Sequence, residues 1–259
     1  MKEQLLQTNQ GLRAHLYHNA DNFENIETIF ILAPGMPNYP EKEFFEPLLS
    51  KLQNAAFVVV YYYGYWFSSG KFSIENSANS ISDIIIALRG GMLSDVFSEN
   101  NLPKYLQKIN LIGYSFGANP LLNSLKKINY ENINNIILAA PLCLVADSQT
   151  ATIDDKILLD FKKYNVDFCN FIARGYSELI RDDSNMLKTH LQGTNKESVV
   201  KIPQVFADKI IVYYGAKDEM IKRPFIDALS ILDITNINVV ENIGHSKKLI
   251  LQAISDLDR

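Results

Sequence analysis

The chain has 259 residues, of which 47% are hydrophobic and 21% are charged. This length and composition fit one globular α/β domain with a sizeable hydrophobic core. The formal net charge is -4, and no Lys/Arg-rich tract is present that would neutralise phosphate groups. These two features argue against nucleic acid as a partner.

The first residues and the cysteines bear on the cellular compartment of the protein. Residues 1–7 contain no apolar core long enough for a signal peptide, and the apolar run 55–63 is too short to span a bilayer. We therefore expect a cytoplasmic protein without stable membrane insertion. Cys143 and Cys169 have neither C-x-x-C nor metal-ligand spacing, so we interpret both as buried small hydrophobic residues.

Short apolar runs alternate along the chain with longer segments of helical periodicity. The runs that we expect to be strands are 12–17, 27–33, 56–63, 109–113, 134–140, 208–214 and 237–240. The segments that we expect to be helices are 44–52, 74–88, 118–128 and 246–257. This alternation is typical of βαβ units around a mostly parallel sheet.

The stretch between residues 140 and 208 breaks the alternation. It has no clear strand pattern, and apolar residues such as Phe168, Phe171 and Ile172 recur there at helical spacing. A simple crossover between parallel strands needs only about a dozen residues. We therefore expect residues 147–204 to form a helical cap inserted into a core made of 1–146 and 205–259. An ordinary crossover with extra helices is the alternative.

Gly113-Tyr114-Ser115-Phe116-Gly117 lies between a predicted strand and a predicted helix. A serine framed by two glycines at such a corner is the pattern of a nucleophile elbow. The tight turn strains the serine backbone, and side chains two positions before and after it would collide. The hydroxyl then lies at a helix N-terminus, where N–H groups stabilise negative charge. A glycine-rich turn with a capping serine is the alternative for the pentapeptide alone.

An acid and a histidine follow the serine in the chain. Asp218 comes just after the predicted strand 208–214, and His245 just after the predicted strand 237–240. The order serine, acid, histidine is that of a known type of catalytic triad. Glu219, which is adjacent, and Asp147, which follows an earlier predicted strand, compete for the acid position.

With these residues the chain resembles the α/β-hydrolase superfamily over nearly its whole length. Within it, the sequence is similar to serine hydrolases of the serine-aminopeptidase and monoacylglycerol-lipase-like type. Residues 63–72 lie where those enzymes carry a D-x-R-G-x-G-x-S-x-G loop, with aromatic residues in place of the Asp and Arg. The resemblance implies an α/β-hydrolase fold, with a mostly parallel central sheet, helices on both faces and a helical cap insertion.

The triad pattern assigns a role to each residue. Ser115 would be the nucleophile, and His245 would take its proton and later deliver it to the leaving group. Asp218 would accept a hydrogen bond from the other ring nitrogen and so fix the tautomer.

An oxyanion hole needs two N–H groups aimed where negative charge develops. The elbow supplies the N–H of Phe116. By resemblance to the H-G-x turn of the family, the N–H of Met36 is the second candidate, with Pro34 in the place of the usual histidine.

Aromatic residues gather beside these loops in the sequence, and most of them suit a core. Tyr65, Trp66 and Phe67 come after the predicted end of a strand. Together with Tyr114 they are the expected wall of a pocket for an apolar acyl or aromatic group.

The sequence thus predicts a serine hydrolase that cleaves a carboxylic ester, or a thioester or small amide, through an acyl-Ser115 intermediate. The expected partner is a small-molecule acyl substrate, and no cofactor or metal is expected. An acyltransferase with the same triad is one alternative. A ligand-binding protein with this fold and little turnover is another, although a binding module would not need all three triad residues. The oligomeric state is not indicated.

Overall fold

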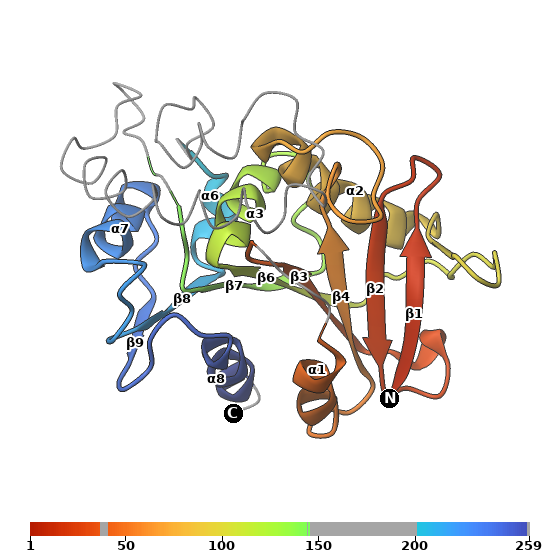
Figure 1. The fold of residues 1–259 in the computed structure, drawn as a ribbon, viewed down its shortest axis with the longest axis horizontal. Helices are drawn as coiled ribbons and strands as arrows, with labels where there is room; N and C mark the ends of the chain where they lie inside the picture. The colour runs from red at the N-terminus through yellow and green to blue at the C-terminus, as the bar shows by residue number, and fades with distance from the viewer. Residues whose placement is uncertain (37–40, 144, 146–200, 258–259) are drawn as a thin grey trace.

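A nine-stranded sheet runs through the described part of the chain, in the order β5-β1-β2-β4-β3-β6-β7-β8-β9 (Figure 1). The structure is a computed structural model, and it describes residues 1–36, 41–143, 145 and 201–257. The strands are β1 (Lys2–Gln7), β2 (Arg13–His18), β3 (Thr28–Ala33), β4 (Ala55–Tyr61), β5 (Ser94–Asp95), β6 (Lys108–Tyr114), β7 (Ile133–Ala139), β8 (Ile210–Gly215) and β9 (Ile237–Val240).

The strands from β4 to β9 in this order pair in parallel, whereas β1, β2 and β5 form an antiparallel margin. This confirms the mostly parallel sheet. Parallel strands end at the same edge of a sheet, where α/β proteins commonly bind their ligands. The loops after β3, β6, β8 and β9 therefore open along one edge.

Helices cover both faces of the sheet, as expected. The helices α1 (Lys42–Leu49) and α8 (Lys248–Leu257) lie on one face, and α2 (Ile74–Gly90) and α3 (Ala118–Ser124) lie on the other (Figure 1). The shorter elements are α6 (Gln204–Ala207), α7 (Arg223–Asp227), η1 (Phe23–Asn25), η2 (Ser115–Gly117) and η3 (Ala228–Leu232). Within the described residues, no helix is both long and apolar enough to cross a bilayer.

The sheet divides the hydrophobic core into two layers, and β4 contributes side chains to both. Val58 and Val60 pack on the side of α2, whereas Phe57 and Val59 pack on the side of α1 and α8. Successive side chains of a strand point to opposite faces, and a strand buried on both faces is apolar throughout. The predicted strand 56–63 is confirmed for this reason, although β4 itself ends at Tyr61.

The remaining predicted elements are also present, with ends that differ by a few residues. The clearest difference is at the predicted helix 118–128, because α3 ends at Ser124. Strands β1 and β5 were not predicted. β1 has the sequence KEQLLQ, whose polar content hides the alternation of a sheet-margin strand. The predicted cap 147–204 falls almost entirely outside the described residues, so it stays a prediction.

The chain turns sharply where β6 passes into η2 and α3. Ser115 has a left-handed backbone with φ of 51°. A Cβ atom on Gly113 would lie 2.8 Å from the Cα of Ala118, and one on Gly117 would collide with the carbonyl oxygen of Ala33. The strained serine and the two steric restrictions predicted for the elbow are therefore confirmed.

His15 in β2 has both ring nitrogens occupied. Its Nδ1 lies 2.6 Å from the Tyr61 hydroxyl, and its Nε2 lies 3.3 Å from a Glu3 carboxylate oxygen. Burial raises the pKa of Tyr61, so the phenol stays protonated and donates to Nδ1, while Nε2–H donates to Glu3. Burial lowers the pKa of His15, and the charge of Glu3 opposes this. The folded state therefore favours the neutral ring.

We predict that Gly117→Ala destabilises the fold by on the order of 3 kcal/mol, because its methyl group would displace the β3 carbonyl. The matched control is Gly90→Ala, where a Cβ meets only the flexible end of Met92; its effect should stay within about 1 kcal/mol. Urea denaturation of both variants measures the difference. Equal stabilities would contradict the close approach at the elbow.

We predict that His15 makes stability fall at mildly acidic pH. An unfolded histidine has a pKa of about 6.5, and that of folded His15 is lower. The stabilisation is therefore fully present above about pH 6.5 and is lost as the pH falls toward the folded pKa. Between about pH 7.5 and about pH 5.5, His15→Gln should lose less unfolding free energy than the wild type in urea titrations. A loss as large as that of the wild type would exclude this source of pH dependence.

Candidate functional site

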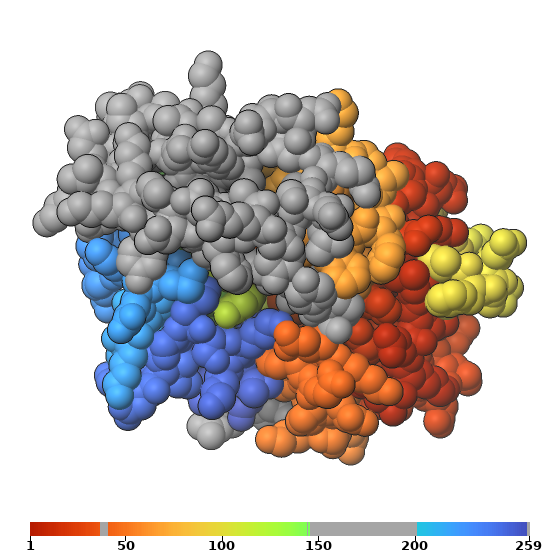
Figure 2. Space-filling view, in the orientation of Figure 1, coloured from red at the N-terminus to blue at the C-terminus, as the bar shows by residue number. Residues whose placement is uncertain are grey.

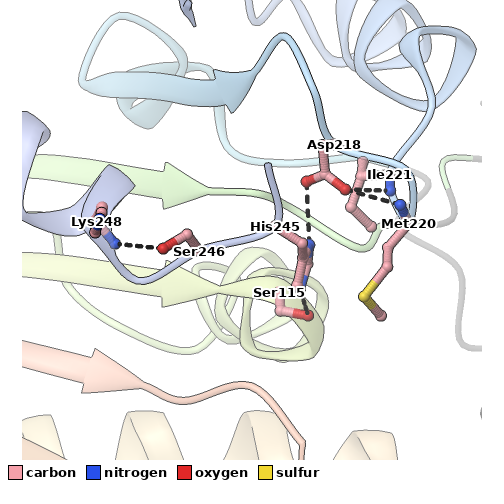
Figure 3. Close-up of polar contacts among 7 residues, drawn as sticks. All are labelled: Ser115, Asp218, Met220, Ile221, His245, Ser246 and Lys248. Atoms are coloured by element: carbon pink, nitrogen blue, oxygen red, sulfur yellow. Dashed lines mark hydrogen bonds and ion pairs between the residues drawn. The ribbon is translucent and has the colours of Figure 1, made fainter. Parts of the chain in front are cut away.

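Ser115, His245 and Asp218 form one chain of hydrogen bonds at the carboxyl edge of the sheet (Figure 3). Ser115 Oγ lies 3.0 Å from His245 Nε2, and His245 Nδ1 lies 3.0 Å from Asp218 Oδ2. The serine follows β6, the acid follows β8 and the histidine follows β9. The structure therefore brings together three residues that are far apart in the sequence.

The partners of the imidazole determine its tautomer. An ionised carboxylate only accepts hydrogen bonds, so Nδ1–H of His245 donates to Asp218. Nε2 is then unprotonated and accepts the hydrogen bond from the Ser115 hydroxyl. The histidine is thus held in the form that can receive the serine proton.

The carboxylate of Asp218 is held on both oxygens. Oδ2 faces His245, and Oδ1 accepts hydrogen bonds from the N–H groups of Met220 at 2.9 Å and Ile221 at 2.8 Å. Its side chain is fully buried. Glu219 is exposed, and Asp147 lies outside the described residues. Among the acids of the described chain, Asp218 is the one that bonds the histidine.

The loops that carry the acid and the histidine are joined by their backbones. Lys217 N–H donates to the carbonyl oxygen of Ile243 at 2.9 Å. A side chain on Gly215 would collide with this same carbonyl and would lie 2.7 Å from that of Gly244. Glycine at the end of β8 therefore allows the histidine loop to approach the acid loop.

The loop after β3 packs directly against the elbow. A Cβ atom on Gly35 would lie 3.1 Å from the Cβ of Ser115 and 3.1 Å from the ring of Tyr114. Met36 and Phe116 are both buried. The two segments that carry the predicted oxyanion N–H groups therefore meet beside Ser115, and the oxyanion role itself stays a prediction.

Tyr114 lies against the catalytic candidates. Its ring centroid is 5.6 Å from that of His245. Burial, followed by the charges of Asp218 and Glu41, raises the pKa of Tyr114 to about 12. The phenol is therefore neutral at physiological pH and can offer a hydrogen bond to a ligand.

The other three predicted pocket residues lie in the segment after β4 and pack against one another. Tyr65 is fully buried, and its ring centroid lies 6.5 Å from that of Phe72. Trp66 stacks on Tyr61, with 5.8 Å between their ring centroids. Phe67 is 53% exposed. Within the described residues, no ring contact joins these three to Tyr114 or His245, so their role as a pocket wall stays a prediction.

A surface ion pair at the edge of the site escaped the sequence analysis. Lys247, two residues after the histidine, lies 3.0 Å from Glu41 and 5.8 Å from the centre of the Phe44 ring. It links the histidine loop to the start of α1, and the surfaces of α1 (orange) and α8 (dark blue) adjoin in Figure 2. Two residues so distant in sequence carry no local pattern that predicts their pairing.

No group of His, Cys, Asp or Glu side chains in the described chain could hold a metal ion. The hydrogen-bonded set instead offers a hydroxyl, a base and a buried carboxylate. This arrangement can activate an oxygen nucleophile without a metal.

Comparisons with known proteins bear on the fold. Neither a family model nor a curated protein matches the sequence. Among solved structures, an esterase from Exiguobacterium antarcticum is 15% identical, with 99% of this chain and 98% of that chain covered and a TM-score of 0.57. A thermophilic esterase from Thermogutta terrifontis is 13% identical, with 100% and 98% covered and a TM-score of 0.58. A bromoperoxidase from Bacillus anthracis is 12% identical, with 99% and 98% covered and a TM-score of 0.56.

These likenesses extend over nearly the whole length of both chains, at identities that inform on the fold alone. They agree with the strand order and with the helices on both faces of the sheet. The chain therefore has the α/β-hydrolase fold.

Proposed function

We propose that the protein is a serine hydrolase that cleaves a carboxylic ester through an acyl-Ser115 intermediate. The observation that carries this proposal is the continuous hydrogen-bonded chain from Ser115 through His245 to Asp218, at 3.0 Å for each bond. The left-handed backbone of Ser115 supports it, because strain of this kind gathers at functional sites.

In the first half of the reaction, His245 Nε2 takes the hydroxyl proton while Ser115 Oγ attacks the carbonyl carbon of the ester. The carbonyl π electrons move to the oxygen, and the N–H groups of Met36 and Phe116 stabilise the resulting oxyanion. Asp218 stabilises the imidazolium. Collapse of the intermediate breaks the bond to the leaving alkoxide, which receives the proton from His245.

In the second half, His245 takes a proton from water, whose oxygen attacks the acyl-serine. Collapse then releases the carboxylic acid and returns the proton to Ser115 Oγ. An acceptor alcohol in place of this water would make the same site an acyltransferase. Product analysis in the presence of an added alcohol separates the two outcomes.

The finer features of the proposal rest on the sequence. They are the likeness to the serine-aminopeptidase and monoacylglycerol-lipase-like type, the choice among ester, thioester and small amide, the cytoplasmic location and the absence of a cofactor. Tyr114 is the part of the proposed pocket with the strongest geometric support, because its ring lies beside His245.

We predict that Ser115→Ala lowers kcat on p-nitrophenyl esters by roughly 10⁴-fold or more, because triad members act as a unit. A fluorophosphonate should add to the wild type at Ser115, as mapped by mass spectrometry of peptides. The matched control is Ser124→Ala, which removes a buried hydroxyl from α3 and should keep both labelling and turnover. Labelling that persists in Ser115→Ala would exclude Ser115 as the nucleophile.

We predict that Asp218→Asn lowers kcat by on the order of 10⁴-fold, because an amide favours the wrong histidine tautomer. Glu219→Gln changes the neighbouring exposed carboxylate in the same way and should leave kcat within about threefold of the wild type, since surface charges contribute little. Steady-state kinetics on one ester compare the two. A larger fall in kcat for Asp147→Asn than for Asp218→Asn would indicate that Asp147 is the acid of the triad.

A further inference from the structure

Tyr62 is a buried tyrosine whose hydroxyl reaches the loop after β3. It directly follows β4 and has no exposed surface. Its hydroxyl donates a hydrogen bond of 2.7 Å to the carbonyl oxygen of Pro34. Burial raises the pKa of Tyr62 well above its ordinary value, so the phenol is protonated and donates at neutral pH.

The ring of Tyr62 contacts the elbow at the same time. It lies edge-on to the ring of Phe116, with 5.7 Å between centroids. The ring of Phe72 lies near both, at 6.3 Å from Tyr62 and 5.8 Å from Phe116. One rigid side chain therefore contacts the elbow through its ring and the loop after β3 through its hydroxyl.

Both ends of this contact belong to the proposed oxyanion hole. Pro34 lies two residues before Met36, and Phe116 directly follows Ser115. The Pro34 carbonyl is also close to the elbow backbone, since a Cβ on Gly117 would lie 2.6 Å from its oxygen. A hydrogen bond to a carbonyl oxygen restrains the orientation of its planar peptide unit. The following Gly35 has no Cβ to restrict its own torsion angles, so the loop gains orientation from Tyr62.

We propose that Tyr62 is a positioning residue that sets the distance and orientation between the two oxyanion N–H groups, an inference that rests on the proposed function. Within the described residues, no hydrogen bond or ring contact joins Tyr62 to Ser115 or His245. Its effect falls on the transition state, where the oxyanion develops, and leaves substrate binding and the proton relay unchanged.

The expected size follows from the known sensitivity of such sites. Removal of an oxyanion donor lowers kcat by about 10²–10³-fold, and a displacement of about 1 Å can lower it by about 10²-fold. Loss of the Tyr62 hydroxyl removes neither oxyanion N–H group. It only allows the segment that carries the Met36 N–H to move. We therefore expect Tyr62→Phe to lower kcat by about 10- to 100-fold with KM within about threefold.

The test compares Tyr62→Phe with Tyr105→Phe as a matched control. Tyr105 is also buried, and its hydroxyl also donates to a backbone carbonyl, that of Lys108, at 3.1 Å. That contact lies at the start of β6, the end of the strand remote from Ser115. Both variants lose one hydrogen bond from a tyrosine hydroxyl to a backbone carbonyl, so thermal unfolding should report losses of stability of the same order. Only Tyr62→Phe should lose kcat.

The decisive readout is a trifluoromethyl ketone, which Ser115 attacks to form a bound oxyanion. Enzyme concentrations are set by fluorophosphonate titration, so that partial unfolding does not lower the apparent kcat. In Tyr62→Phe the inhibition constant should rise by about the same factor as kcat/KM falls, while the pH profile of kcat/KM keeps its shape. A side chain that only supports the fold would move neither quantity.

The possible results distinguish the role of Tyr62 from the proposed hydrolase function. A wild type that neither hydrolyses esters nor reacts with fluorophosphonate overturns both. An active wild type whose Tyr62→Phe variant matches Tyr105→Phe in kcat overturns the role of Tyr62 alone. If Tyr62→Phe does not fold, Phe72→Leu loosens the same ring packing with the hydroxyl retained. A threefold or larger fall in its kcat at constant KM supports the proposal, and an unchanged kcat contradicts it.

Discussion

The backbone contact between the elbow and the loop after β3 is the constraint on which the rest of the site depends. Gly117 packs onto the carbonyl groups of Ala33 and Pro34 so closely that a single added carbon would collide with them. Ser115 takes a left-handed backbone in the same turn. Because β3 and β6 are neighbouring parallel strands, their ends bring the serine and the predicted Met36 N–H to one place without help from a longer loop.

The backbone also organises the charges of the site. The carboxylate of Asp218 is buried, and two N–H groups and the imidazole bond it. In the proposed mechanism it would keep this orientation while charge moves on His245. Preorganised dipoles of this kind need no rearrangement during the reaction. The ion pair between Lys247 and Glu41 is of another kind. It is partly exposed, so its net stabilisation is small, and its importance lies in joining α1 to the histidine loop.

Local sequence patterns were sufficient to predict the tight turn at Ser115 and the residues that hydrogen-bond there, Asp218 and His245, whose catalytic roles stay proposals. The glycine pair around Ser115 and the strand ends before Asp218 and His245 are steric and topological features, and each is visible within a few residues. The proposed role of Tyr62 was not predicted, because the sequence pattern of a tyrosine at the end of a buried strand is the same whether its hydroxyl faces the core or a functional loop. Strand β1 was missed because its sequence, KEQLLQ, is mostly polar, although it pairs with β2 across a short turn.

The proposed function requires that Ser115 becomes acylated during turnover. Rapid mixing with p-nitrophenyl acetate, followed by acid quenching within milliseconds and peptide mass spectrometry, tests it most directly. We expect an acetyl group on the peptide that contains Ser115, together with a burst of p-nitrophenol if deacylation is slower than acylation. Turnover with no acyl group on this peptide, or with the acetyl group on another residue, would contradict it.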